Sequence, residues 1–466
     1  MNKKKFLINM LVVFGILVYF LISKKDNLTL LQSSNYNFIV FIYSIIGISN
    51  IYIYSKDRIS IFDSLNIINF IYFMMFIYYP LRDINKNETL FFGMQTENGT
   101  KMATIILFIS YFSYIFGYFS KKSNQKVRKT ENYSKNFRSK IFYVALMIWT
   151  IGFFANLFYI MKSGASLSYI FTLGKIGYVS KNGDNSLFGF IGIFGYLMIA
   201  PLFYIKEYSS KKWIFYFSYI MTLLFFILRG FRFVIVIIIV MFVVYYYTKN
   251  HKTPKLKAIT LLLMILLLMI TSLRIYRNDL RSGNETVALN NINFFETVED
   301  SLYDNFSMYK PFYILVERIP KELPHTLGVK IFINPLIMFV PRILWKDKTF
   351  LGGGTSDNIY VKEVYRSGNA AICNFGEFYM DFGVIGCILF QYIFGVISIN
   401  IKKNKDFNIN SLIKYSIFIP LNLQIIIRGY MASNFNLILF IFLPIWIIEF
   451  LFFKRTNLVL LTKNEN

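Results

Sequence analysis

Long apolar segments alternate with short polar ones along almost the whole chain. Each apolar segment is about 15–20 residues long, the length that a helix needs to cross the hydrocarbon core of a bilayer. The pattern predicts about twelve membrane-spanning helices, with expected bounds 6–22, 38–54, 64–80, 102–119, 141–161, 187–204, 213–228, 233–247, 258–272, 383–400, 412–427 and 437–453. We therefore expect an all-α, polytopic integral membrane protein that forms a single membrane domain over residues 1–466.

The amino-acid composition argues against the soluble classes of protein. Of the 466 residues, 56% are hydrophobic and only 16% are charged, whereas a soluble domain carries about 25% charged residues. A soluble enzyme, a secreted disulfide scaffold and a disordered regulator are all disfavoured. The first apolar segment follows Lys3-Lys4-Lys5 as in a signal peptide, but it ends in Ser23-Lys24-Lys25 without a small-residue cleavage site. We interpret it as an uncleaved first span.

The distribution of basic residues predicts the orientation in the membrane. The net charge is +25, which in a soluble protein would suggest a nucleic-acid partner. Membrane proteins instead keep Lys and Arg in cytoplasmic loops, and we expect no nucleic acid here. With the N-terminus inside, the cytoplasmic segments hold 26 basic residues and the short outside loops hold 11. Both termini are thus predicted to be cytoplasmic.

One long loop, 273–382, is predicted to lie outside the membrane between the ninth and tenth spans. It has about 110 residues, and an unstructured loop of this length would be unusual. Residues 294–318 have helical spacing, with an apolar stripe made of Phe295, Val298, Leu302 and Phe306. The apolar run 331–340 is too short to cross, and Arg342 and Trp345 follow it. We expect 331–345 to lie on the outer face or to dip into it.

Arginine is concentrated on the predicted outer side. Only 4 of the 26 inside basic residues are Arg, against 10 of 23 outside. A guanidinium group is a planar fork that matches phosphate or carboxylate. The outside arginines at span ends are therefore candidates for binding an anion at membrane depth, such as a lipid diphosphate. They are Arg229, Arg232, Arg274, Arg277, Arg281, Arg342 and Arg428.

The strongest of these signals is Arg229-Gly230-Phe231-Arg232, the whole connection between spans 213–228 and 233–247. Helices of this length reach only about 23 Å, short of the ~30 Å hydrocarbon core, so the tip is expected to be recessed. Arg274, Arg277 and Arg281 share one face if the ninth span continues outward as a helix. The alternatives are snorkelling to lipid headgroups and a plain interfacial girdle.

Two carboxylates precede the tenth span. Glu377 and Asp381 lie four residues apart in the string from Gly368 to Gly383, so they share a face if this string is helical. Glu377 is the candidate general base, with Asp381 and His325 as secondary candidates. The alternative is a negative charge that complements a helix N-terminus.

Other motif-based chemistry is not supported. The chain has no Cys/His metal cluster, no Walker A loop and no GxSxG elbow. We therefore expect no metal and no cofactor. The two cysteines, Cys373 and Cys387, are not expected to form a disulfide, because one lies inside an apolar run and the other outside it.

The layout and motifs resemble the Wzy-type O-antigen or capsule repeat-unit polymerases. The resemblance rests on the many spans, the Arg229–Arg232 hairpin, the long late outer loop and the strings Pro341-Arg342, Gly376-Glu377-Phe378-Tyr379 and Phe382-Gly383. It implies a membrane architecture like that of the C-type glycosyltransferases and an inverting, metal-independent transfer at the outer face of the bacterial cytoplasmic membrane.

The resemblance also implies substrates and partners. The donor would be a growing glycan on undecaprenyl diphosphate, and the acceptor one lipid-linked repeat unit. Membrane lipids, a chain-length regulator and a repeat-unit flippase would be partners. Arg229, Arg232, Arg274, Arg277 and Arg342 would grip the diphosphates, and Glu377 would be the base. An O-antigen ligase and a lipid-linked oligosaccharide flippase or other transporter remain the alternative functions.

Overall fold

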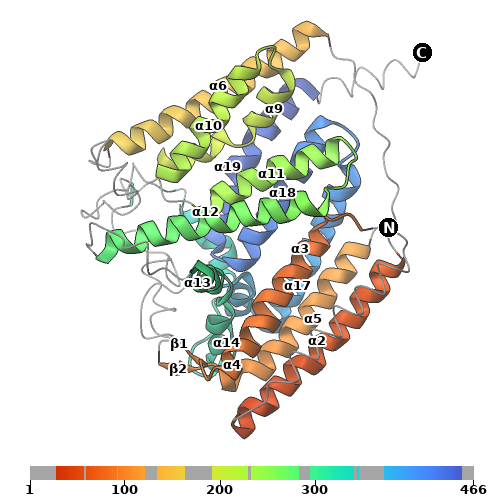
Figure 1. Cartoon of the computed structure of the whole chain (residues 1–466), viewed down its shortest axis with the longest axis vertical. Coiled ribbons are helices and arrows are strands. Elements are labelled where there is room, and N and C mark those ends of the chain that lie inside the picture. The colour runs from red at the N-terminus through yellow and green to blue at the C-terminus, as the bar shows by residue number, and fades with distance from the viewer. Residues whose placement is uncertain are drawn as a thin grey trace.

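The computed structural model of the chain is built almost entirely of helices (Figure 1). It describes residues 28–56, 59–91, 93–120, 134–162, 191–228, 232–282, 294–338, 340, 344–345 and 372–453. The described strands are a two-residue antiparallel pair, β1 (Leu90–Phe91) and β2 (Met94–Gln95). The prediction of an all-α protein is confirmed.

Seven described helices or helix runs are long and apolar enough to cross a membrane. They are α2 (Leu30–Lys56), the run of α3 (Ser64–Ile71), η1 (Tyr72–Tyr78) and α4 (Tyr79–Asn85), α5 (Glu97–Phe119), α6 (Lys135–Lys162), α17 (Asn374–Asn404), α18 (Ile409–Ile427) and α19 (Met431–Ile448), which η5 (Glu449–Phe453) extends. The chain is therefore a multi-pass membrane protein, as predicted.

Shorter helices fill most of the remaining predicted spans. They are η2 (Phe194–Met198), α9 (Pro201–Tyr208), α10 (Lys212–Leu228) and α11 (Arg232–Lys249). The longer helix α12 (Leu256–Ser282) covers the predicted span 258–272. The predicted first span, 6–22, lies outside the described residues. A total of twelve crossings and an architecture like that of the C-type glycosyltransferases remain predictions.

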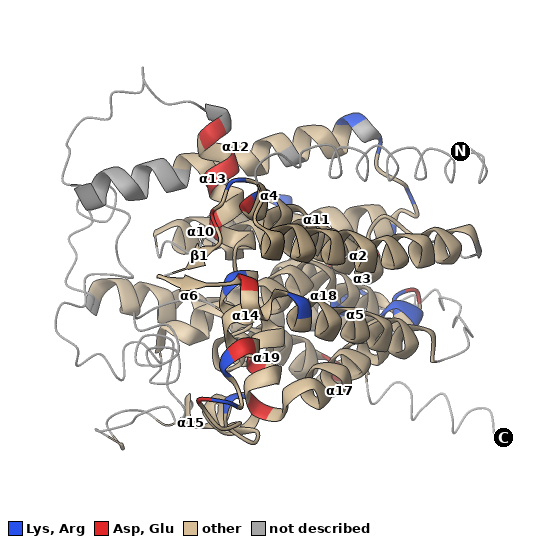
Figure 2. Ribbon diagram, turned by 90° about the horizontal axis from the view of Figure 1, so that it is seen from below, with Lys and Arg blue, Asp and Glu red and all other residues tan. Residues whose placement is uncertain are grey.

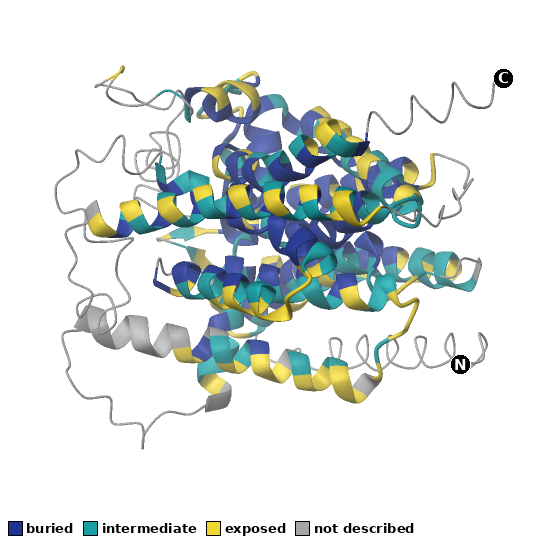
Figure 3. Cartoon of the chain, turned by 90° about the horizontal axis from the view of Figure 1, so that it is seen from above, coloured by how far each residue is buried: buried dark blue, intermediate teal, exposed yellow. Residues whose placement is uncertain are grey.

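The buried apolar side chains form two large cores. The first core joins α2 to α5 with α14 (Tyr309–Arg318) and the beginning of α17. The second core joins α6, α9, α10 and α11 with most of α18 and α19. In Figure 1 the first group lies low and right and the second above it, with buried residues concentrated in the middle of the molecule (Figure 3). The two cores meet along α17 and α18, because Phe394 packs against both.

Helices α5 and α17 approach each other through glycine. A Cβ atom on Gly117 would lie 2.2 Å from the carbonyl oxygen of Tyr392, and one on Gly395 would lie 2.2 Å from that of Tyr114. Only glycine allows the two backbones to pack this closely, as is common between membrane helices. The contact fixes α17 against the first core, and α17 carries the two candidate carboxylates.

The long loop contains the helices that the spacing predicted. Helices α13 (Phe294–Phe306) and α14 replace the predicted helix 294–318, and Phe306 and Leu302 both pack into the first core. After them, η4 (Val329–Ile333) and α15 (Asn334–Met338) lie against α17 and α19. The short apolar run thus packs between two long helices.

A charged network attaches α13 and α14 to the end of α4. Asp83 is almost fully buried, pairs with Lys310 at 2.7 Å and accepts a hydrogen bond from the hydroxyl of Tyr303 at 2.8 Å. Its neighbour Arg82 donates to Glu299 at 2.8 Å. In Figure 2 most of the long helices are uncharged over much of their length, whereas α13 carries several acidic residues.

Candidate functional site

The helical backbone of α17 is interrupted about one third of the way along the helix. Phe382 and Gly383 have non-helical backbone angles, and Gly383 adopts φ +60° and ψ −144°. The break leaves carbonyl groups of the preceding turn without helical partners, and the chain at 325–327 supplies new ones. The N–H of Thr326 donates to the carbonyl of Met380 at 2.9 Å, and that of Leu327 donates to the carbonyl of Asp381 at 3.1 Å. The long loop is thereby attached to α17 next to the predicted carboxylates.

His325 completes this attachment. Its Nδ1 atom lies 3.0 Å from the carbonyl oxygen of Tyr379, and a carbonyl can only accept, so Nδ1 carries the proton. In the neutral ring Nε2 then holds the free lone pair. The ring is half-buried between Tyr379 and Gly383, where a Cβ atom would lie 3.2 Å from Cε1.

Asp381 fixes the backbone of the short apolar run. The carboxylate is fully buried and accepts hydrogen bonds from the N–H of Lys330 at 3.1 Å, the N–H of Ile331 at 2.8 Å and the hydroxyl of Thr326. A carboxylate at the beginning of a helical segment satisfies the N–H groups that have no helical partner there. Both carboxylate oxygens of Asp381 therefore already accept hydrogen bonds from η4 and the residues just before it.

Glu377 lies one helical turn before Asp381, as the spacing predicted. Its side chain is 3% exposed, and Oε2 accepts a hydrogen bond from the N–H of Met431 at 2.8 Å. The adjacent segment is held by a second contact, from the N–H of Gly429 to the carbonyl of Ile372 at 2.7 Å. Glu377 thus lies where the beginning of α17 meets the beginning of α19.

Arg428 connects this meeting point to two further elements. Its guanidinium donates to Oδ1 of Asn305 at 3.1 Å and lies 5.9 Å from the ring centre of Phe233. Asn305 belongs to α13, and Phe233 is the second residue of α11, directly after Arg232. The end of α18 and the beginnings of α11, α17 and α19 therefore converge.

The remaining predicted arginines are described only in part. Arg232 begins α11, and Arg274, Arg277 and Arg281 lie on α12, which continues as a helix to Ser282, but their side chains are outside the described part of the structure. Arg229 and Arg342 lie outside the described residues altogether.

The sequence did not single out Lys330. This side chain is 2% exposed, and the backbone N–H of the same residue donates to Asp381 at 3.1 Å. Its place directly before an apolar run was the available signal, since a lysine that begins a buried segment needs a charged partner.

The buried amides of Asn422 and Asn436 also lack hydrogen-bond partners within the described residues, and they lie on α18 and α19 within two turns of the 428–431 connection.

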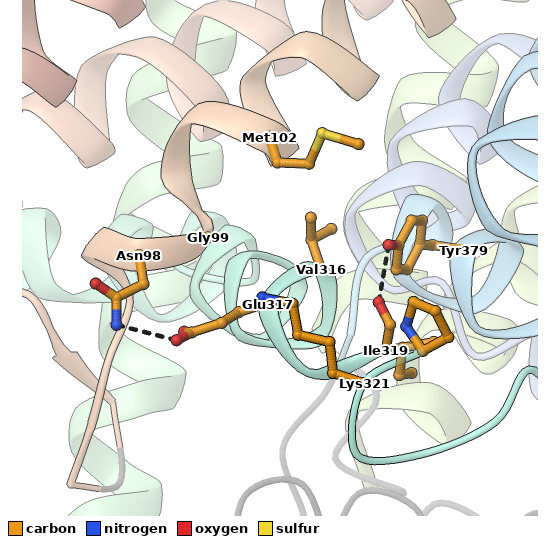
Figure 4. A pocket seen from close by; sticks show the side chains of 9 residues that line it. Asn98, Gly99, Met102, Val316, Glu317, Ile319, Lys321 and Tyr379 are labelled. Carbon is orange, nitrogen blue, oxygen red and sulfur yellow. Dashed lines mark hydrogen bonds between the residues drawn. The ribbon is translucent and has the colours of Figure 1, made fainter.

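A separate pocket of about 520 Å³ lies on the Tyr379 side of α17 (Figure 4). It is enclosed by the beginning of α5 and the end of α14, and its lining is Asn98, Gly99, Met102, Val316, Glu317, Ile319, Pro320, Lys321 and Tyr379. The amide of Asn98 donates to Glu317 at 2.9 Å, and the hydroxyl of Tyr379 donates to the carbonyl of Ile319 at 3.0 Å. Neither Glu377 nor Asp381 lines this pocket.

The fold and this convergence define a multi-pass membrane protein with a buried charged site at the ends of its helices. The chain matches the family model for the O-antigen polysaccharide polymerase Wzy over residues 5–456, and it belongs to that family. It therefore polymerises O-antigen repeat units, acting on lipid-linked oligosaccharides in the membrane. No curated protein and no solved structure matches the chain.

Proposed function

We propose that this polymerase works at the outer face of the bacterial cytoplasmic membrane as an inverting, metal-independent glycosyltransferase. The donor is a growing glycan on undecaprenyl diphosphate, and the acceptor is a single repeat unit on the same lipid. The observation that carries the proposal is the position of Glu377, a buried carboxylate at the point where α17, α19 and η4 meet. The family match gives no support to a ligase or a transporter. A chain-length regulator and a repeat-unit flippase are proposed partners.

The chemistry needs a base and a cation. Glu377 takes the proton from the acceptor hydroxyl as that oxygen attacks the anomeric carbon, and general-base catalysis contributes roughly 10²–10⁴-fold. The departing lipid diphosphate carries the bonding electrons away and needs positive charge beside it. Arg428 is near the required place, because it ends the helix that leads to Met431. The proposal assigns the same role to Arg229, Arg232, Arg274, Arg277, Arg281 and Arg342.

The central test is Glu377→Gln. This variant keeps the shape of the side chain and one carbonyl oxygen for the N–H of Met431, so we expect it to fold and insert but to leave single repeat units on the lipid. The control is Glu449→Gln, which removes a carboxylate paired with Lys414 just beyond the other end of α19. The length distribution of surface glycan, at matched protein levels, is the measurement. Wild-type chain lengths with Glu377→Gln would remove Glu377 from the mechanism.

The proposed diphosphate contacts are tested by Arg229→Lys and Arg232→Lys. Lysine keeps the charge but loses the bidentate fork. Loss of one charge-assisted contact costs roughly 1.5–3 kcal/mol, which predicts a fall of about 10- to 150-fold in binding of the lipid-linked donor to purified protein. If both variants bind the donor and polymerise normally, headgroup snorkelling is the better account of these arginines.

The stereochemistry and the metal requirement have direct tests. An inverting transfer predicts that the new linkage has the opposite anomeric configuration to the sugar–diphosphate bond of the donor, which NMR of the polymer determines. Metal independence predicts that polymerisation in membrane vesicles is unchanged by a chelator. Retention of configuration, or loss of activity that added divalent cation restores, would contradict the proposal.

A further inference from the structure

The pocket in Figure 4 lies beside the candidate site but is separate from it. Its volume of about 520 Å³ is within the range of small-molecule sites, roughly 300–1,000 Å³. Tyr379 forms part of its wall and follows Glu377 by two residues in α17. Because the side chain of Glu377 does not line the pocket, a ligand held there would leave that carboxylate free.

The walls of the pocket are fixed by contacts between its elements. Gly99 lets α5 lie against α14, since a Cβ atom on Gly99 would be 1.9 Å from the carbonyl oxygen of Tyr313. This approach places Asn98 beside Glu317, to which its amide donates at 2.9 Å. On the other side, the hydroxyl of Tyr379 donates to the carbonyl of Ile319 at 3.0 Å. A pocket built in this way is already formed before a ligand arrives, which lowers the cost of binding.

The polar groups of the pocket have unused hydrogen-bonding capacity. Asn98 donates to Oε1 of Glu317, which leaves Oε2 of Glu317 and the amide oxygen of Asn98 as acceptors. Lys321 supplies an ammonium with three donors. Its side chain is exposed and has no hydrogen bond or ion pair within the described part of the chain. The pocket therefore offers a ligand both donors and acceptors.

The remaining lining is apolar and includes Met102, Val316 and Pro320. A sugar ring fits such a mixture, because each hydroxyl group both donates and accepts and the C–H faces are apolar. A diphosphate fits poorly, because the carboxylate of Glu317 repels an anion. An isoprenoid chain also fits poorly, because it would cover Glu317 and Lys321 without giving them a polar partner.

We propose that this pocket binds sugar residues of a lipid-linked oligosaccharide, at a distance from the bond that reacts. The proposal rests on the polymerase activity and on the outer face proposed for it, but not on the identity of the base. Ile319 and Thr326 are both hydrogen-bonded to α17. The segment between them, which carries Lys321, is thus held against the helix that carries Glu377, so sugars bound in the pocket orient the rest of the substrate.

The first experiment measures binding of the lipid-free oligosaccharide of one repeat unit to the purified full-length protein, by saturation-transfer NMR. We compare Glu317→Gln and Lys321→Met, whose side chains are at least partly exposed, with wild type. Each variant loses a hydrogen bond to a charged group, so we expect the affinity to fall about tenfold. The matched control is Glu322→Gln. The side chain of Glu322 is 57% exposed, pairs with Arg318 and does not line the pocket, so its affinity should equal that of wild type.

The second experiment measures polymerisation in membrane vesicles, with the lipid-linked donor and acceptor varied separately. We expect Glu317→Gln and Lys321→Met to raise KM about tenfold with little change in kcat, because they remove binding and not chemistry. The substrate whose KM rises is the one whose sugars occupy the pocket.

Three results would overturn the proposal. They are no binding of the oligosaccharide by wild type, wild-type affinity and KM in both pocket variants, and an equal loss in Glu322→Gln. The Glu377→Gln variant should bind the oligosaccharide as wild type does but not polymerise. Normal polymerisation by Glu377→Gln would instead remove the proposed base and leave the sugar pocket in place, so the two failures are distinguishable.

Discussion

Glu377 and Asp381 are both carboxylates in the first part of α17, but their hydrogen-bond partners differ. Asp381 is used to hold the turn at 326–331, whereas Glu377 has one oxygen bonded to the N–H of Met431. We therefore expect Asp381→Asn to act mainly on stability. The amide keeps one acceptor oxygen but loses the negative charge, and hydrogen bonds to charged groups are worth roughly 1.5–3 kcal/mol.

The measurement for Asp381→Asn is thermal unfolding of detergent-purified protein. A clear fall in the unfolding temperature is expected. The control is Glu322→Gln, because the side chain of Glu322 is 57% exposed and forms a surface pair with Arg318 four residues earlier; such pairs contribute little. Equal unfolding temperatures for Asp381→Asn and wild type would contradict the assigned role.

The sequence predicts that the two carboxylates share one helical face, but it does not predict which groups donate hydrogen bonds to them. Spacing of four places Glu377 and Asp381 on one helical face, and the helix is present. The donors to them come from Thr326, Lys330 and Met431, about 50 residues away in either direction. No local periodicity encodes such contacts, because they depend on how the loop packs between α17 and α19.

At the scale of elements, the break in α17 decides how the long loop is attached. The tenth span was expected to begin at residue 383, whereas the helix begins at Asn374 and changes direction at 382–383. Hydropathy places the boundary late, because the first part of the helix carries Asn, Glu and Asp. These polar residues are nevertheless buried, since neighbouring elements supply their partners.

Gly383 makes this break possible, and Gly383→Ala tests it. A side chain at φ +60° and ψ −144° is strained by about 1–3 kcal/mol, and the new Cβ atom would press on the ring of His325. We expect a lower protein level and shorter glycan. The control is Ile385→Ala, two residues further along and 73% exposed, which should leave both unchanged. Wild-type level and length in Gly383→Ala would show that the break is not needed.

At the scale of the whole molecule, the site depends on the union of the two cores. Glu377 lies in the first turn of α17, which packs with α5 in the first core, whereas Met431 begins α19, most of which packs in the second. The long loop joins them, because α14 is part of the first core and α15 lies against α19. A site assembled in this way requires α17 and α19 to begin on the same side of the membrane, which the proposed topology provides.

That topology is the last prediction, with both termini cytoplasmic and 273–382 outside. Single cysteines are introduced at two exposed positions, Ser134→Cys before α6 and Lys321→Cys after α14. The native Cys373 and Cys387 are both buried, so wild-type protein should show little background with a membrane-impermeant thiol reagent. In sealed, right-side-out vesicles we expect labelling at position 321 and none at 134 until the membrane is permeabilised. The count of 26 basic residues in the predicted inside segments against 11 in the short outside loops predicts this orientation. The reverse pattern would mean that the protein has the opposite orientation, with Glu377 on the cytoplasmic side. The proposal of a reaction at the outer face would then be wrong.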